Sequence, residues 1–190
     1  MPTDLQSPRT SRLVVGITGR IGAGKTSAAK YLSARYGFQY LRYSQVLSDW
    51  RAKDPESKSH LQEVGWNVMA GGLQAELNQR LIAQIAKDRD AVVDGLRHPI
   101  DFESLAESFS SSFHLLYIDS PLDTRRLRLQ GLGRYQTAEI FEAADSHPVE
   151  QRIESLRAKA DVVLDNRSSL KDLYTSLDKT ILNLRSEGHV

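Results

Sequence analysis

Short apolar or aromatic runs alternate along the chain with longer segments of helical spacing. The five runs are LVVG at 13–16, FQYLRY at 38–43, AVVD at 91–94, FHLLYID at 113–119 and DVVLD at 161–165. Helical spacing covers 26–36, 45–52, 56–86, 99–107, the segment after 120–121, 149–160 and 168–184. Strands joined through helices imply right-handed parallel crossovers. The pattern therefore predicts an α/β fold in which five parallel strands form a doubly wound sheet with helices on both faces.

Turn and cap residues set the expected boundaries of these elements. Gly37 supplies a stop for the first helix, and Ser44 is placed to cap the helix over 45–52. Gly71-Gly72 interrupts the helical stretch 56–86 with a bend or short loop. The segment 135–147 has a mixed pattern without a strong strand signal.

A glycine-rich turn follows the first apolar run and leads into the first helix. Gly19, Gly24, Lys25 and Thr26 have the spacing of a phosphate-binding loop, with an additional glycine at Gly22. Glycines let the backbone wrap an anion, and the helix N-terminus adds partial positive charge. Lys25 can then reach the β- and γ-phosphates, and the Thr26 hydroxyl can ligate Mg²⁺. A chance glycine-rich turn is the weaker interpretation, because the strand and helix that the loop needs flank it here.

Composition narrows the class of protein further. The chain has 190 residues, 40% of them hydrophobic and 26% charged, which suits one compact domain over 13–186 behind a polar tail at 1–12. A net charge of +1 gives no case for nucleic-acid or membrane binding. The absence of cysteine excludes disulfides and thiolate metal sites. No run approaches the roughly 20 apolar residues of a membrane span, so we expect a cytoplasmic protein.

Two charged residues follow the third run at the carboxyl edge of the expected sheet, where ligands bind in such folds. Asp94 ends an apolar strand and can support Mg²⁺ opposite Thr26, although strand-end aspartates also serve in turns. Arg97 can bind the phosphate of a second substrate through two parallel hydrogen bonds, the alternative being a solvated surface arginine.

Arginines also gather in the segment 125–147. Arg125 and Arg128 share a helix face, and Arg134 follows a pair of glycines. Such a set can neutralise the charge that builds up during phosphoryl transfer and can exclude water as a closing lid. A basic solvated helix face is the alternative, and Arg126, on another face, is the weakest member of the set.

Several of these motifs together resemble a known superfamily. GITGRIGAGKTSAAKYL, YIDSPLDTRRLRL and ADVVLDNRSSLKDL are similar to segments of dephospho-CoA kinases. YSQVLSDW, LQEVGWNVMAGG and VVDGLRHPIDFESL resemble deoxynucleoside monophosphate kinases and their kinase-like relatives. The chain is thus similar, over about 13–180, to P-loop nucleoside monophosphate kinases. The resemblance implies a three-layer P-loop NTPase fold with a five-stranded parallel sheet, a small acceptor-binding helical insert at about 44–86 and a lid at about 125–147.

The resemblance also implies roles for individual residues. ATP would be bound by Gly19, Arg20, Ile21, Gly22, Ala23, Gly24, Lys25, Thr26, Ser27 and, near the adenine, Asn166. Mg²⁺ would be held at Thr26 and Asp94. The acceptor would be bound by Ser44, Gln62, Gly65 and Arg97. Catalysis would depend on Lys25, Arg97, Arg125, Arg128 and Arg134.

Three functional hypotheses follow. The leading one is ATP- and Mg²⁺-dependent phosphoryl transfer to a nucleoside or deoxynucleoside monophosphate, a small-molecule nucleotide. The second is a dephospho-CoA kinase-like enzyme that phosphorylates a sugar hydroxyl; such enzymes usually carry Asp-Ala-Asp after the second strand, where this chain has Arg42-Tyr43-Ser44. The third is a nucleotide-sensing module with little turnover, suggested by a lid with few arginines and by Lys58 at a position where relatives often have arginine. No sequence feature sets the oligomeric state.

Overall fold

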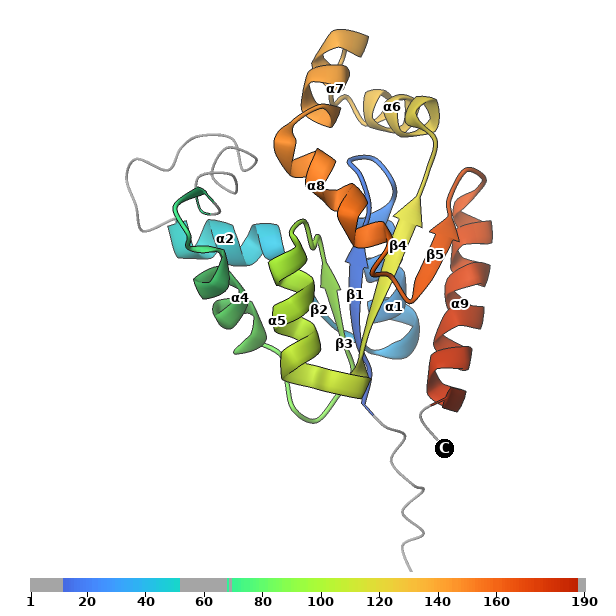
Figure 1. Cartoon of the computed structure of the whole chain (residues 1–190). Helices are drawn as coiled ribbons and strands as arrows, with labels where there is room; N and C mark the ends of the chain where they lie inside the picture. Colours follow the sequence, from blue (N-terminus) through green and yellow to red (C-terminus); the bar gives the residue numbers. More distant parts are fainter. Residues whose placement is uncertain (1–11, 52–67, 69, 188–190) are drawn as a thin grey trace, which may run out of the picture.

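One parallel sheet organises the molecule. The computed structural model describes residues 12–51, 68 and 70–187. Its sheet has the strand order β2-β3-β1-β4-β5, and every neighbouring pair is parallel (Figure 1). The strands are β1 (Val14–Thr18), β2 (Gln39–Arg42), β3 (Ala91–Asp94), β4 (Phe113–Asp119) and β5 (Val162–Asp165). The five-stranded parallel α/β fold predicted from the sequence is therefore confirmed.

Helices separate the strands in sequence, as the apolar spacing predicts. They are α1 (Lys25–Tyr36), α2 (Tyr43–Arg51), α4 (Gln74–Ile82), α5 (Pro99–Phe109), α6 (Leu122–Gly131), α7 (Ala138–Asp145), α8 (Pro148–Arg157) and α9 (Leu170–Glu187), with a 3₁₀ turn at Ser110–Ser112. Ser44 was expected to cap the second of these helices. That expectation is wrong, because α2 begins at Tyr43 and places Ser44 inside its first turn. The mixed segment 135–147 contains α7, which Thr137 caps by accepting a hydrogen bond from the Ile140 amide.

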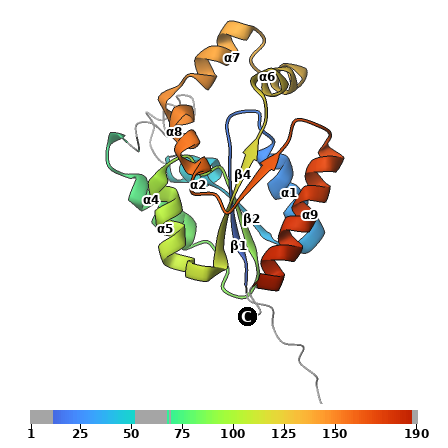
Figure 2. The ribbon, with the colours of Figure 1, turned by 45° about the vertical axis from the view of Figure 1, so that its right-hand side comes forward.

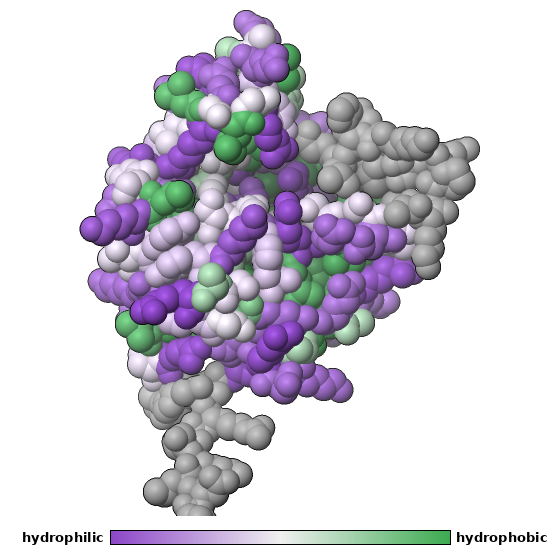
Figure 3. Space-filling view, turned by 180° about the vertical axis from the view of Figure 1, so that it is seen from behind, coloured by the Kyte–Doolittle hydropathy of each residue, from purple (hydrophilic) through white to green (hydrophobic). Residues whose placement is uncertain are grey.

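Two apolar layers cover the sheet, one on each face. Side chains alternate along a strand, so Val14 of β1 packs with α2, α4 and α5, whereas Val15 and Ile17 pack with α1 and α9. All five residues of β1 are buried, as expected of a central parallel strand. Figures 1 and 2 show α1 and α9 together on one side of the sheet and α4 and α5 on the other. Seen from behind, the described surface is mainly hydrophilic, with hydrophobic residues in separate small patches (Figure 3).

The carboxyl ends of the strands form the edge where the candidate site lies. The loop after β1 emerges there, and α6, α7 and α8 stand beside and above it in both ribbon views (Figures 1 and 2). The fold thus brings residues that are more than a hundred positions apart in sequence to the same loop. The lid at about 125–147 and the insert at about 44–86 remain predictions as functional units.

Candidate active site

The loop between β1 and α1 has the backbone that the glycine spacing predicts. Gly19, Gly22 and Gly24 all have positive φ angles, of 141°, 78° and 107°. A Cβ atom on Gly19 would lie 2.4 Å from the carbonyl oxygen of Ile118, a contact that rigid backbone cannot relieve. Glycine is therefore required at this position both by conformation and by space.

This requirement gives a first prediction. Gly19→Ala should distort the loop and reduce nucleotide binding, because the new methyl group meets the β4 backbone. Gly37→Ala is the matched control: its φ of 73° is also positive, but no atom lies within 4 Å of the added Cβ. Alanine at position 37, at the end of α1, carries left-handed strain of roughly 1–2 kcal/mol without a clash, whereas alanine at position 19 meets both a backbone conformation that L residues rarely adopt and the Ile118 carbonyl. Equal losses of ATP binding in calorimetry would contradict the prediction.

Lys25, the first residue of α1, lies against the loop. Its ammonium group donates hydrogen bonds to the carbonyl oxygens of Gly19, at 2.6 Å, and Arg20, at 3.0 Å. Burial of the ammonium lowers the pKa of Lys25 to about 8, an effect partly offset by the nearby carboxylate of Glu150. The loop thus carries a positive charge in a partly desolvated position, where its attraction for an anion would be stronger than in water.

Thr26 and Asp94 meet at the start of α1, as the sequence predicts for a magnesium site. The Thr26 hydroxyl donates to Asp94 Oδ2 at 2.8 Å, and the Tyr40 hydroxyl donates to the same oxygen at 3.0 Å. Asp94 is buried, with Arg42 Nε 3.7 Å from its carboxylate. Burial, together with this carboxylate, raises the pKa of Tyr40, so the phenol stays a donor.

This pair fits Mg²⁺ of the kind that binds with substrate phosphates. Hydroxyl and carboxylate oxygens are hard ligands, and protein-bound Mg²⁺ usually keeps several waters. No group of three or more His, Cys, Asp or Glu side chains within the described residues could hold a metal ion. In Mg²⁺ sites of this kind, phosphate oxygens and water complete the coordination.

Arg97 reaches the loop through a residue that the sequence did not reveal. The backbone amides of Arg97 and His98 both donate to Asp101 Oδ2 at 2.9 Å, which fixes the turn after β3. The Arg97 guanidinium donates to Glu150 Oε1 at 2.9 Å, and the Ile21 amide of the loop donates to Glu150 Oε2 at 2.8 Å. Glu150 is fully buried. In sequence it is one glutamate of an amphipathic helix, and only its position in the first turn after His147-Pro148 sets it apart.

Arg125 is held by a buried carboxylate that the sequence did not reveal either. Its guanidinium contacts Asp145 at 2.5 and 3.3 Å and also donates to the carbonyl oxygens of Ile21 and Ser120. Arg20 of the loop lies 3.0 Å from the same carboxylate. The predicted lid arginine thus ties α6 to the end of α7 and to the loop.

The remaining predicted residues of the lid and the adenine site differ in their surroundings. Arg128 donates to Ser120 Oγ, Asn166 Oδ1 and Ser168 O, and burial lowers its pKa. Asn166 is buried and donates to the Ala23 carbonyl at 2.8 Å, so it helps to hold the backbone of the loop in place. Arg134 is exposed, with its guanidinium 5.8 Å from the centre of the Tyr135 ring.

The predicted acceptor residues are only partly covered by the structure. Ser44 is half-buried in α2. Gln62, Gly65 and the unusual Lys58 lie outside the described residues. Ser27 belongs to the first turn of α1 and is also half-buried.

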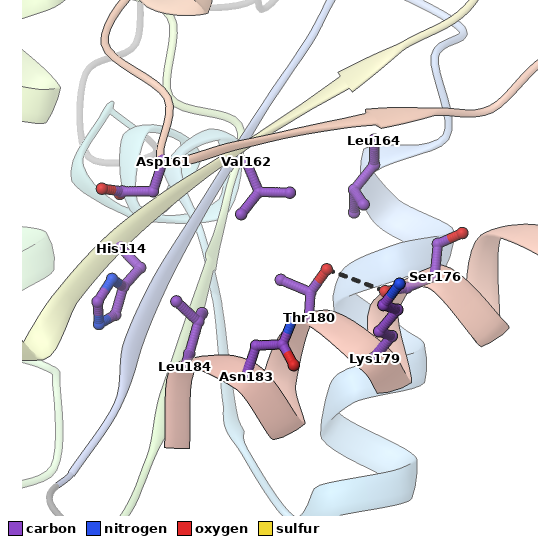
Figure 4. Close-up of a pocket in the computed structure, with 9 residues that line it drawn as sticks. All are labelled: His114, Asp161, Val162, Leu164, Ser176, Lys179, Thr180, Asn183 and Leu184. Carbon is purple, nitrogen blue, oxygen red and sulfur yellow. Dashed lines mark hydrogen bonds between the residues drawn. The ribbon is translucent and has the colours of Figure 1, made fainter. Parts of the chain in front are cut away.

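A cavity of about 550 Å³ lies elsewhere, between the edge strand β5 and α9 (Figure 4). Figure 4 shows His114 and Asp161 on one side and the α9 residues Ser176, Lys179, Thr180 and Asn183 on the other. The dashed bond, from Thr180 Oγ1 to the Ser176 carbonyl at 2.9 Å, is internal to α9. None of the loop residues lines this cavity, so we place the chemistry at the loop and not here.

Comparisons with known proteins agree with this geometry. The phosphate loop, the sheet and its strand order are those of the three-layer P-loop NTPase fold, which solved structures of similar shape share. A family model described as "AAA domain" matches residues 18–140, and the chain belongs to that family. No helix among the described residues is both long and apolar enough to cross a membrane.

Individual relatives are distant but match along most of their length. A UPF0200 protein of Aeropyrum pernix is 26% identical, covering 86% of this chain and 89% of that protein. A dephospho-CoA kinase of Frankia casuarinae is 27% identical, covering 87% of this chain and 80% of the kinase. The solved shikimate kinase from Acinetobacter baumannii in complex with shikimate has a TM-score of 0.61 at 16% identity, covering 92% of this chain and 95% of that one. The last likeness concerns the fold alone.

Proposed function

We propose that the protein transfers the γ-phosphoryl group of ATP to the phosphate of a nucleoside or deoxynucleoside monophosphate. One observation carries the proposal: the Ile21 amide of the donor loop and the Arg97 guanidinium contact the two oxygens of a single carboxylate. An acceptor phosphate bound by Arg97 would therefore lie directly beside the donor phosphates. Positioning the donor and acceptor phosphates next to one another is a main part of how a protein catalyses phosphoryl transfer.

Each group near the loop has a role in this proposal. Lys25 and the loop amides bind and orient the donor phosphates, and Arg97 orients the acceptor. Mg²⁺ held at Thr26 and Asp94 would neutralise phosphate charge when bound. The acceptor oxygen of a monophosphate is already anionic, so no strong base is needed. Asp101, whose carboxylate is used by three donors of the turn and of α4, is not free to act as one.

A second candidate is phosphorylation of a hydroxyl group, as in dephospho-CoA kinases. Several relatives with that name, between 21% and 27% identical, favour it. A hydroxyl acceptor needs a base, and the described residues at the end of β2 are Arg42, Tyr43 and Ser44, without a carboxylate. The lack of a carboxylate among these residues favours a monophosphate over a hydroxyl group as the acceptor.

The test is ADP production with ATP, Mg²⁺ and one acceptor at a time. The panel contains ribo- and deoxynucleoside monophosphates and dephospho-CoA. We expect turnover with at least one monophosphate and none with dephospho-CoA. Turnover with dephospho-CoA alone would establish the second candidate. Tight ATP binding without transfer to any acceptor would indicate a nucleotide sensor instead.

Arg97→Met gives a sharper prediction for the preferred monophosphate. Loss of a charge-assisted hydrogen bond costs about 1.5–3 kcal/mol, which corresponds to roughly a 10- to 150-fold higher KM for the acceptor. The KM for ATP should change little. Arg126→Met is the matched control, because Arg126 pairs with the exposed Asp123 away from the loop. An unchanged acceptor KM in Arg97→Met would contradict the assignment.

A further inference from the structure

Glu150 occupies an unusual place for a carboxylate. It is fully buried, it accepts hydrogen bonds from Ile21 N at 2.8 Å and Arg97 Nη1 at 2.9 Å, and it also interacts with the charge of Lys25. These are the groups expected to bind the phosphates of two substrates. We propose that Glu150 is a displaceable internal anion that pairs with these groups before substrate binds, and that substrate phosphate expels it. This proposal rests on the proposed function, because it takes the loop and Arg97 as phosphate-binding groups.

The cost of burying the charge of Glu150 explains why this carboxylate is stable only while substrate does not use its hydrogen-bond donors. A buried carboxylate costs several kcal/mol unless donors and cations surround it. Here the compensation comes from Ile21, Arg97 and Lys25. A polyphosphate needs the same donors and brings several negative charges close to Glu150. Two anions that share the same donors in a partly buried site repel one another strongly. Glu150 and a bound phosphate therefore exclude one another.

The position of Glu150 in the fold allows it to leave. It lies in the first turn of α8, directly after the connection Ser146–His147 that separates α7 from α8. Asp145, on the other side of that connection, binds Arg20 of the same loop. Two carboxylates of the α7–α8 segment thus attach it to neighbouring loop residues. Expulsion of Glu150 breaks the contact between α8 and Ile21 of the loop. The contact between Asp145 and Arg20 stays in place.

One functional consequence is coupling between the two substrates. A donor phosphate that displaces Glu150 also frees the Arg97 guanidinium for the acceptor. The second substrate then binds without having to remove the carboxylate, which raises its affinity. The reverse order has the same effect, since thermodynamic coupling is reciprocal.

The test compares Glu150→Gln with Glu154→Gln, a glutamate on the exposed side of the same helix that accepts from Tyr117. Sodium tripolyphosphate and ATP are titrated calorimetrically into each protein without acceptor. We expect Glu150→Gln to bind both about tenfold more tightly than wild type, within the usual range of coupling effects. Its melting temperature without ligand should fall, because Arg97 and Lys25 lose their counter-charge. Glu154→Gln should bind as wild type does.

Opposite results identify other roles. Weaker or unchanged polyphosphate binding by Glu150→Gln would overturn the proposal and make Glu150 a positioning residue for Arg97. If the Gln variant does not fold, Glu150→Asp serves instead: its shorter side chain cannot reach both partners, and tighter binding is again expected. Because no acceptor is present, failure of the monophosphate assay and failure of this proposal are separate results.

Discussion

Lys25→Met should reduce phosphoryl transfer by about 10²–10³-fold, the effect typical of removing one preorganised electrostatic group from an active site. The ammonium group lies within 3.0 Å of two loop carbonyls, so its charge lies where we propose that the donor phosphates bind. Methionine keeps most of the aliphatic stem and removes the charge together with its hydrogen bonds to the loop carbonyls. The measurement is kcat/KM for ATP in the ADP-release assay with the preferred acceptor, together with the Kd for ATP.

Lys30→Met provides the control for this experiment. Lys30 lies on the exposed side of the same helix α1, so its replacement should leave both parameters as in wild type. The Lys25 variant should stay folded, because burial already disfavours the charged amine, as its lowered pKa shows. ATP binding and turnover indistinguishable from wild type in Lys25→Met would contradict the whole assignment of the loop.

Local sequence patterns were sufficient to predict the sheet and the loop. The five strands appear as apolar runs because parallel strands are buried on both faces. The loop appears because Gly19 and Gly24 need positive φ angles, a property of single residues. Lys25, Thr26 and Asp94 follow from the ends of these elements, and the 2.8 Å contact between Thr26 and Asp94 agrees with that prediction.

The carboxylates around the loop could not be predicted in the same way. Glu150 is 129 positions from Ile21, and Asp145 is 20 positions from Arg125. Periodicity shows which face of a helix is apolar, but it does not show which acidic residue at a helix end meets which donor. Spacing placed Arg125 among catalytic arginines, whereas in the structure its donors are used by Asp145 and by backbone carbonyls. A catalytic role for Arg125 therefore requires that these contacts rearrange, and it stays a prediction.

Two kinds of arginine can thus be separated at this site. Arg97 is partly exposed and is linked to the loop through Glu150, which the proposed mechanism removes. Arg125 is buried and links the loop, α6 and α7. The first is suited to exchanging one anion for another, and the second to holding α6 and α7 to the loop. A change at Arg97 should therefore affect acceptor kinetics, and a change in the Arg125 pair should affect folding.

Asp145→Ala should destabilise the fold by about 3–5 kcal/mol, the usual cost of removing one partner from a buried ion pair. Asp145 is buried and contacts both Arg125 and Arg20. Its removal leaves the guanidinium of Arg125, only 4% exposed, without its counter-charge. For a chain of this size the loss corresponds to a fall of roughly 6–20 °C in melting temperature. Urea unfolding followed by circular dichroism measures the free energy.

Asp123→Ala tests whether burial causes this loss. Asp123 also pairs with an arginine of α6, Arg126, at 2.9 Å, but its side chain is 75% exposed. Exposed pairs contribute less than about 1 kcal/mol, since water solvates each charge when the partner is removed. The two variants therefore delete the same chemical group beside the same helix and differ in desolvation. Equal destabilisation by both would show that the Asp145 contacts do not hold α6 and α7 to the loop, and the division of roles between Arg97 and Arg125 would then fail.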